Sequence, residues 1–110
     1  SLNGASAIIE KDLTSGLLAQ ELNADTLLIL TSVEKVSLNL DMDNEEFLGE
    51  ISVADAKKYM DENQFAPGSM LPKFEAGVNF VEKGDGRRTI ITDIAHAKDG
   101  VYEKTGTIIK

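Results

Sequence analysis

An unbroken apolar run at residues 26–31 places the tightest constraint on the fold of this chain. The run reads Thr-Leu-Leu-Ile-Leu-Thr and shows no alternation of apolar and polar residues. A strand with one face in water alternates, whereas a strand covered on both faces is apolar throughout, as in the parallel sheets of α/β proteins. Residues 89–94, Thr-Ile-Ile-Thr-Asp-Ile, are rich in β-branched residues and predict another buried strand. The two runs predict an α/β fold with helices on both faces of a largely parallel sheet.

Two helices are predicted between these runs. Ser52 and Asp55 are spaced like the polar pair of a capping box, which predicts a helix that continues to about residue 62. A second helix should begin at Met70 and end at the glycine-rich turn of residues 84–86. Apolar residues that repeat at helical spacing, and should therefore face the core, are Val53, Ala56, Tyr59 and Met60, then Phe74, Val78 and Val81.

The N-terminal region is predicted to add a strand and a further helix. Residues 7–9 form a short apolar run that suits a buried strand, and Asp12 suits the N-cap of a helix. Leucines at helical spacing follow, at positions 13, 17, 18 and 22. Together with the run at 26–31, these segments predict a strand–helix–strand unit with a right-handed crossover.

Shorter segments complete the predicted fold. Residues 33–40 alternate loosely, which favours an extended arm or a hairpin strand, and an acidic surface loop follows at 41–46. A helical turn should follow residue 94, and a last strand should occupy 106–109. The whole chain, residues 1–110, is expected to form one α/β domain.

Composition and charge argue against several classes of function. Nineteen acidic and eleven basic residues give a net charge of −8, which disfavours nucleic acids and anionic membrane surfaces as partners. The chain has no cysteine and a single histidine, His96, so neither a cysteine nucleophile nor a protein-held metal is predicted. No apolar run approaches the length of a membrane span, and the N-terminus lacks a signal-peptide pattern. We therefore expect a soluble, cytoplasmic protein.

Three segments carry candidate functional residues, and each also has a purely structural interpretation. Lys11 and Asp12 follow the first strand, at the edge where open α/β sheets bind ligands, or they form a surface ion pair. Residues 65–73 place a Pro-Gly-Ser turn and Lys73 at a helix N-terminus, which suits an anion, or they are an ordinary loop before a helix. Residues 30–36 leave the second strand with small polar residues and valines, which suits a flat heterocycle or a plain strand-exit loop.

Taken in order, these segments resemble a known family. Lys11-Asp12, the Leu-Thr-Ser-Val-Glu-Lys-Val run at 30–36, the Phe-Ala-Pro-Gly-Ser-Met-Leu-Pro-Lys-Phe-Glu-Ala element at 65–76 and Lys-Thr-Gly-Thr at 104–107 are similar to carbamate kinases, which belong to the amino acid kinase family. The resemblance implies a three-layer αβα sandwich with a mainly parallel sheet. It also implies reversible phosphoryl transfer between ATP and carbamate, used mostly to make ATP from carbamoyl phosphate and ADP.

The resemblance implies a role for each candidate residue. Lys11 and Lys73 would clamp the transferred phosphoryl group, and Asp12 would orient both ammonium groups. Such a site suits phosphoryl transfer, because the charge of its loose transition state is spread over phosphate oxygens. ATP or ADP would bind with Mg²⁺ as a bridge between phosphates, held chiefly by nucleotide and water. The implied nucleotide-binding residues are Thr31, Ser32, Val33 and Val36 on the adenine side, and Gly68, Ser69 and Met70 beside the phosphates or ribose.

Two residues and the chain length depart from the family pattern. Ser37 stands where many members carry a tyrosine, and Leu71 where they often carry a glycine. Carbamate kinases are also well over twice as long, and the glycine-rich phosphate loop and carbamate pocket of their N-terminal half have no counterpart in these residues. The resemblance therefore implies the C-terminal, nucleotide-binding portion of such an enzyme, inactive by itself.

Partners and alternatives follow from this comparison of lengths. A sheet without its other half exposes an edge, which predicts self-association or pairing with an N-terminal half. The alternative interpretation is a non-catalytic nucleotide-binding or protein-interaction module with the same fold. A related kinase that acts on acetylglutamate, glutamate or aspartate fits the element at 65–76 less well.

Overall fold

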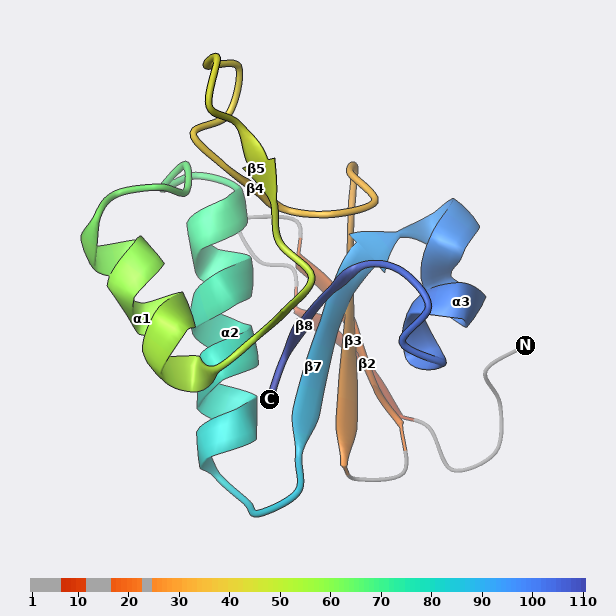
Figure 1. Cartoon of the computed structure of the whole chain (residues 1–110). Coiled ribbons are helices and arrows are strands. Elements are labelled where there is room, and N and C mark those ends of the chain that lie inside the picture. The colour runs from red at the N-terminus through yellow and green to blue at the C-terminus, as the bar shows by residue number, and fades with distance from the viewer. Residues whose placement is uncertain (1–6, 12–16, 23–24) are drawn as a thin grey trace.

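The computed structural model describes residues 7–11, 17–22 and 25–110 of the chain. The strands are β1 (Ala7–Lys11), β2 (Leu17–Leu22), β3 (Thr26–Thr31), β4 (Ser37–Leu38), β5 (Glu46–Phe47), β6 (Glu50–Ile51), β7 (Arg88–Asp93) and β8 (Thr107–Ile109). The helices are α1 (Val53–Asp61), α2 (Met70–Glu82), the 3₁₀ turn η1 (Ile94–His96) and α3 (Ala97–Val101). Six strands form one sheet in the order β1-β2-β3-β7-β8-β6, and β4 and β5 form a separate pair above it (Figure 1).

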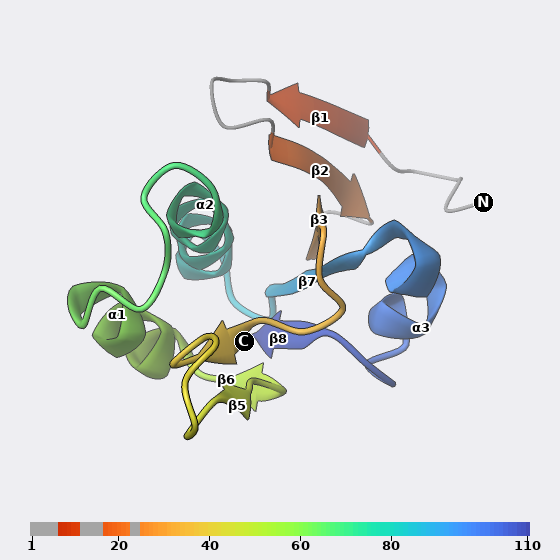
Figure 2. The same cartoon turned by 90° about the horizontal axis from the view of Figure 1, so that it is seen from above.

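Helices cover both faces of the sheet, so the fold is the expected three-layer α/β arrangement. α1 and α2 lie on one face and α3 lies on the other (Figure 2). Successive residues of β3 enter separate cores: Leu27 and Ile29 pack beneath α1 and α2, whereas Leu28 packs with Leu22 and Ile90 on the side of α3. Because both faces of β3 are buried, its sequence needs no polar alternation, and the prediction from the apolar run is confirmed.

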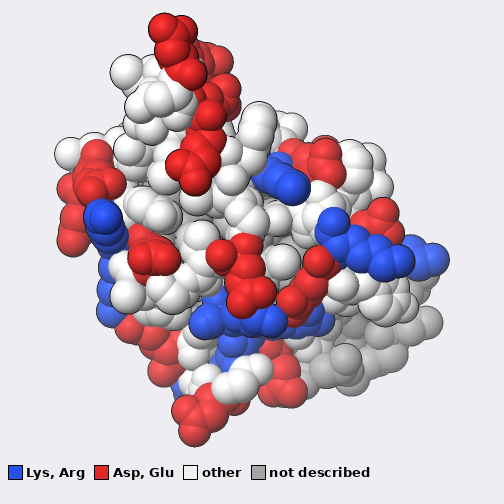
Figure 3. Space-filling view, viewed as in Figure 1, with Lys and Arg blue, Asp and Glu red and all other residues white. Residues whose placement is uncertain are grey.

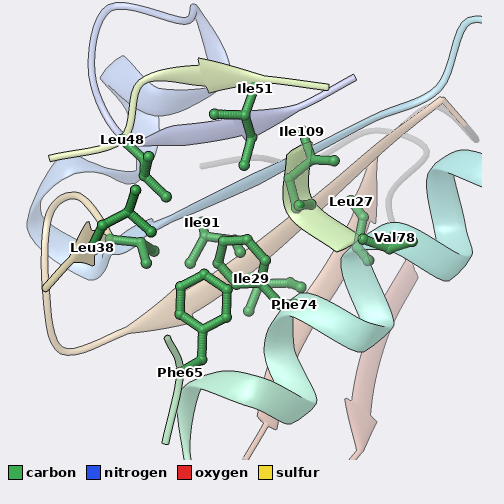
Figure 4. Packing of buried hydrophobic residues seen from close by; sticks show 12 residues of the cluster. Leu27, Ile29, Leu38, Leu48, Ile51, Phe65, Phe74, Val78, Ile91 and Ile109 are labelled. Atoms are coloured by element: carbon green, nitrogen blue, oxygen red, sulfur yellow. The ribbon is translucent and has the colours of Figure 1, made fainter. Parts of the chain in front are cut away.

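The larger core lies between α2 and the sheet (Figure 4). Phe74 of α2 is fully buried and stacks on Phe65, with the ring centroids 4.0 Å apart. Ile29 and Ile91 complete this core from β3 and β7, and both are fully buried. The Phe65–Phe74 pair therefore holds the loop before α2, and the first turns of that helix, against the sheet.

Both predicted helices are confirmed. The Ser52 side chain accepts a hydrogen bond from the Asp55 backbone N–H at 3.0 Å, as an N-cap does. All the residues predicted to face inward pack on the core: Val53, Ala56, Tyr59, Met60, Phe74, Val78 and Val81. Ser69 occupies the N-cap position of α2 but makes no side-chain capping bond.

Replacing Gly77 with alanine should destabilise the protein, although alanine is the better helix former. A Cβ at this position of α2 would lie 2.8 Å from Thr89 Cγ2 and 3.3 Å from Ile109 Cδ1. Thr89 cannot easily move, since it is fully buried and its hydroxyl donates to the Gly77 carbonyl at 3.0 Å. Overpacking costs about 1–3 kcal/mol, against about 1 kcal/mol gained in helix propensity. Urea unfolding should therefore show a lower free energy of unfolding for Gly77→Ala.

Gly49→Ala is the matched control for that substitution. A Cβ at Gly49 meets no atom within 4 Å, so the change should leave stability within about 0.5 kcal/mol of the parent. A Gly77→Ala protein as stable as the parent would contradict the close packing of α2 on β7.

The predicted helix over residues 13–22 is wrong. Residues 17–22 form strand β2, which pairs antiparallel with both β1 and β3. Leucines four residues apart share one face of a strand as well as one face of a helix, so the spacing of Leu18 and Leu22 did not distinguish the two. The strand–helix–strand unit is thus replaced by a run of antiparallel strands. The predicted N-cap, Asp12, lies outside the described residues.

The sheet is consequently mixed. β3 pairs parallel with β7, and β6 pairs parallel with β8. The β1–β2, β2–β3 and β7–β8 pairs are antiparallel. The α/β fold class is confirmed. The parallel arrangement is interrupted at β2, which runs antiparallel to β1 and β3, and at β8, which runs antiparallel to β7.

Residues 36–48 form an arm that projects beyond the sheet (Figure 1). Of the two forms predicted for residues 33–40, an extended arm or a hairpin strand, the structure shows a hairpin strand at Ser37–Leu38. Ser37 pairs with Phe47, and Leu38 pairs with Glu46, across the β4–β5 ladder. The predicted acidic loop forms the tip of this arm, where Asp41, Asp43 and Glu46 are exposed. The helical turn after β7 and the last strand, β8, are also as predicted.

Candidate functional site

A cavity of about 600 Å³ opens at the carboxyl end of β3. Its walls are the strand-exit loop that follows β3, the β4–β5 arm, the loop between α1 and α2, and the first turns of α2. The lining residues are Thr31, Ser32, Val33, Glu34, Lys35, Val36, Ser37, Leu40, Glu45, Phe47, Gln64, Phe65, Ala66, Ser69, Met70 and Lys73. Ligands of open α/β sheets bind at the carboxyl ends of the strands, and this cavity occupies that place.

Two lysines line the cavity, Lys35 on the strand-exit loop and Lys73 on α2, and Lys73 is the one that bonds the end of β3. It lies in the second turn of α2, half-buried, and its Nζ donates a hydrogen bond to Thr31 Oγ1 at 3.0 Å. Burial lowers the pKa of the Lys73 ammonium from its ordinary value. No carboxylate of the described residues forms an ion pair with it, so within that part of the chain its charge is available to an anion.

The start of α2 offers fewer free backbone donors than the sequence suggested. The N–H groups of Ser69 and Leu71 both donate to the Ala66 carbonyl, at 3.1 and 3.0 Å. Pro72 has no N–H to donate. An anion at this helix end would therefore rely on the helix dipole and on Lys73 more than on a row of backbone donors.

Two buried threonines of the sheet form hydrogen bonds with the backbone of the strand-exit loop. Thr92 of β7 donates to the Glu34 carbonyl at 2.9 Å. Thr107 of β8 accepts from the Val36 N–H at 2.9 Å and donates to the Leu48 carbonyl at 2.7 Å. Both threonines are fully buried, so the loop and the base of the arm are fixed to the sheet.

The arm is also bound to the loop between the two helices. The Asn39 N–H donates to Gln64 Oε1 at 2.9 Å, and Gln64 Nε2 donates to Asn39 Oδ1 at 3.3 Å. Asn39 has a φ of 56°, a left-handed backbone that asparagine tolerates better than most residues. This reciprocal pair joins two of the cavity walls, the arm and the loop between α1 and α2.

The structure brings together most of the residues predicted from the sequence. Seven of them line the cavity: Thr31, Ser32, Val33, Val36, Ser69, Met70 and Lys73. Gly68, which directly precedes Ser69 in the chain, is not part of the lining.

Lys11 ends β1 at the same edge of the sheet as the cavity. Glu10 and Leu30 both pair with Leu18 of the intervening strand β2. Lys11 and Thr31, the next residues of β1 and β3, therefore lie at the same height in the sheet, with β2 between them. Two strand spacings correspond to roughly 10 Å between backbones. Asp12 lies outside the described residues, so its predicted position beside Lys11 and Lys73 stays a prediction.

Sequence reasoning missed the residues that the arm contributes. Leu40 and Phe47 line the cavity although they lie on either side of the acidic loop. The available signal was their apolar character within an otherwise charged surface segment. Ser37, the departure from the family pattern, also lines the cavity, and its hydroxyl donates to Glu45 Oε2 at 2.9 Å.

His96 forms a charged cluster beside the strand-exit loop. Its Nδ1–H donates to Asp93 Oδ1 at 2.6 Å, and its Nε2 lies 3.7 Å from Glu34 Oε1. The hydrogen bond that His96 donates to Asp93, and the charges of Asp93, Glu34 and Asp99, raise the pKa of the imidazole above its ordinary 6.5. Glu34 also accepts a hydrogen bond from Thr105, so this cluster connects the loop to η1 and to the segment before β8.

The raised pKa of His96 predicts a pH-dependent contribution to stability. A group whose pKa is raised on folding stabilises the native state below its unfolded pKa, and that stabilisation is lost as the pH rises through the folded pKa. Wild type should therefore exceed His96→Gln in free energy of unfolding at pH 5.5, and the difference should vanish at pH 8.5. As His96 is the single histidine, proton NMR can follow its titration without assignment, and Asp93→Asn should lower its pKa. Titration at or below 6.5 in the native protein would contradict the cluster.

Two further properties of the described residues bear on function. They contain no group of three or more His, Cys, Asp or Glu side chains placed to hold a metal ion. Across the described helices, length and apolarity fall short of what crossing a bilayer requires.

Comparisons with known sequences agree with one another. Residues 1–93 match the profile of the amino acid kinase family. The chain is 48% identical over 108 residues to "Carbamate kinase-like protein YqeA" of Escherichia coli K12, an alignment that covers 98% of this chain and 35% of that protein. It is 46% identical over 107 residues to "Carbamate kinase 3" of Staphylococcus aureus USA300, covering 97% of this chain and 35% of that protein.

Comparison with solved structures also finds similarity to a carbamate kinase. The carbamate kinase from Giardia lamblia bound to AMP-PNP matches with a TM-score of 0.73 and 35% identity, over 77% of this chain and 27% of that one. The chain thus spans about a third of the length of the relatives that it matches, 35% in both curated sequences.

Proposed function

Because the chain belongs to the amino acid kinase family, we propose that it forms the ATP/ADP-binding portion of a carbamate kinase-like phosphotransferase. The observation that carries this proposal is the cavity at the end of β3, where Lys73 and Thr31 meet beside an apolar wall. A nucleotide needs both features, a cation for its phosphates and an apolar surface for its base. A relative whose structure holds AMP-PNP supports the choice of nucleotide.

The reaction proposed for the whole enzyme is carbamoyl phosphate plus ADP giving carbamate plus ATP, and its reverse. The bond between phosphorus and the carbamoyl oxygen breaks, and a bond between phosphorus and a β-phosphate oxygen of ADP forms. Lys73 would stabilise the negative charge on the transferred group, with Lys11 opposite it and Asp12 orienting both ammonium groups. The transfer needs cationic stabilisation and positioning rather than a general base.

Magnesium would be held by the nucleotide phosphates and water rather than by a protein cage. The described residues lack the cluster of carboxylates that such a cage requires. We therefore assign no step of the reaction to the metal, and binding of ADP should be compared with and without Mg²⁺.

The chain by itself is proposed to bind nucleotide without turning over carbamoyl phosphate. Its relatives are about three times as long, and the carbamate site is proposed to lie in the remaining portion, supplied as an N-terminal half or by a partner. Loss of a whole substrate site removes the proximity contribution to catalysis, which is worth several kcal/mol. A non-catalytic nucleotide-binding or interaction module with the same fold is the second candidate, since the cavity alone could bind a nucleotide without catalysing its reaction.

Calorimetric titration of the 110-residue chain with Mg-ADP tests the proposal. We expect saturable binding of one ADP per chain. A chain that is folded by circular dichroism and gives no binding would overturn it. Adding the N-terminal portion of a carbamate kinase distinguishes the two candidates: recovered turnover of carbamoyl phosphate supports the enzyme portion, and binding without turnover supports the module.

A further inference from the structure

Phe47 is an aromatic side chain that the fold does not need to bury. It lies on β5 of the arm, is 64% exposed, and lines the cavity. Its cross-strand partner is Ser37, whose small side chain also lines the cavity. Directly paired residues point to the same face of a two-stranded ladder. Phe47 is therefore the bulky side chain on the cavity side of this ladder.

The neighbours of Phe47 in the cavity are apolar or already hydrogen-bonded. Leu40 of the arm is 62% exposed and Val33 of the strand-exit loop is 39% exposed, and both line the same cavity. The nearby polar side chains of Ser37 and Gln64 are bonded to Glu45 and Asn39. This end of the cavity thus offers apolar surface for a flat ring.

Charge fixes which end of a nucleotide would lie against the arm. Carboxylates gather on the arm (Figure 3), and Glu45 is itself part of the cavity wall. They disfavour phosphate at this end, whereas the two lysines of the lining, Lys73 on α2 and Lys35 on the strand-exit loop, lie on other walls and attract phosphate there. The base should therefore point toward Phe47 and the phosphates toward Lys73.

We propose that Phe47 is a specificity-determining residue that contacts the face of the ligand's heteroaromatic ring and holds it against the cavity. This inference rests on the proposed nucleotide site and adds to it a residue from the arm, which the sequence motifs did not indicate. Leu40 extends the same surface. The contact recognises an aromatic face, so it acts on nucleotides and has no effect on ligands that carry phosphate alone.

Binding of two ligands to four variants tests the proposal. Mg-ADP carries base and phosphates, and Mg-pyrophosphate carries phosphates alone. Phe47→Ala should weaken ADP binding about tenfold, the range that base–aromatic stacking gives on alanine substitution, and leave pyrophosphate binding unchanged. Phe47→Tyr keeps the ring and should keep ADP affinity. Lys73→Met should weaken both ligands.

Tyr102→Ala is the matched control. Tyr102 is 66% exposed, close to the 64% of Phe47, but it is not among the residues that line the cavity. Its truncation should therefore change neither the ADP affinity nor the pyrophosphate affinity. Unchanged ADP affinity in Phe47→Ala would overturn the inference and leave the nucleotide site intact. An equal loss of ADP and pyrophosphate would also overturn it, since that pattern means a disordered arm. Absence of ADP binding in the parent chain would overturn both the proposed function and this inference.

Discussion

Replacing Lys73 with methionine should weaken Mg-ADP binding by roughly 10- to 100-fold, because a charge-assisted hydrogen bond contributes about 1.5–3 kcal/mol. Methionine keeps the unbranched apolar stem that packs in the second turn of α2, but it removes the ammonium that bonds Thr31. Lys73 is half-buried, so its ammonium is partly withdrawn from water, and this burial lowers its pKa. A phosphate beside it would be screened less than at an exposed lysine. Calorimetry at two salt concentrations measures the effect.

The matched control for this substitution is Lys58→Met. Lys58 is exposed in the last turn of α1 and is not among the residues that line the cavity. Its replacement removes the same charge from the protein and should leave ADP affinity within about twofold, since exposed charges far from a site contribute little. Equal losses in the two variants would show that only net charge matters, and would contradict a specific role for Lys73.

Replacing Phe74 with alanine should cost about 3–5 kcal/mol of stability, a large part of the roughly 5–15 kcal/mol that holds a domain of this size together. Phe74 has no exposed surface and its ring stacks on Phe65 at 4.0 Å with an interplanar angle of 24°. The cavity left behind would adjoin Ile29 and Ile91, which the sheet holds in place and which therefore cannot collapse into it. Urea unfolding followed by circular dichroism measures the loss.

Phe47→Ala provides the comparison for this second prediction. The same atoms are removed from a side chain that is 64% exposed, so the free energy of unfolding should change by less than about 1 kcal/mol. Similar losses at Phe47 and Phe74 would contradict the arrangement of core and arm. The comparison also shows whether Phe47→Ala is folded well enough for the binding test.

The parts of the fold that the sequence predicted share one physical cause. Leu27, Leu28 and Ile29 had to be buried together, and only a strand covered on both faces allows that. Helix α1 was equally predictable. The hydrogen bond from the Asp55 N–H to Ser52 joins residues only three positions apart, so the sequence itself shows the capping pattern.

The missed strand shows where local patterns fail. β2 is held by backbone pairing to β1 and β3, and that pairing depends on neighbours rather than on its own leucine spacing. Leu18 and Leu22 satisfy a helical and an extended pattern equally. When the spacing of apolar residues fits both patterns, the tertiary neighbours determine whether the segment is a strand or a helix, and a single sequence does not show those neighbours.

The candidate site was predictable along two walls and not along the third. Thr31 and Lys73 belong to segments with recognisable motifs, and the structure brings their side chains to 3.0 Å, a contact that the motifs did not predict. Phe47 lines the cavity because β5 pairs with β4, in an arm that the bond from Asn39 to Gln64 fixes to the loop between α1 and α2. That contact joins residues 25 positions apart and has no local signature.

The most direct test of the nucleotide site is amide NMR of the isotopically labelled chain, titrated with Mg-ADP. The amides that shift should concentrate in residues 31–37, 45–47 and 64–73 and at Leu40, which together contain all the residues that line the cavity. Amides of the groove between Lys57 and Glu82, on the outer side of α1 and α2, should not move. Shifts centred on that groove, or none at saturating ADP, would contradict the account.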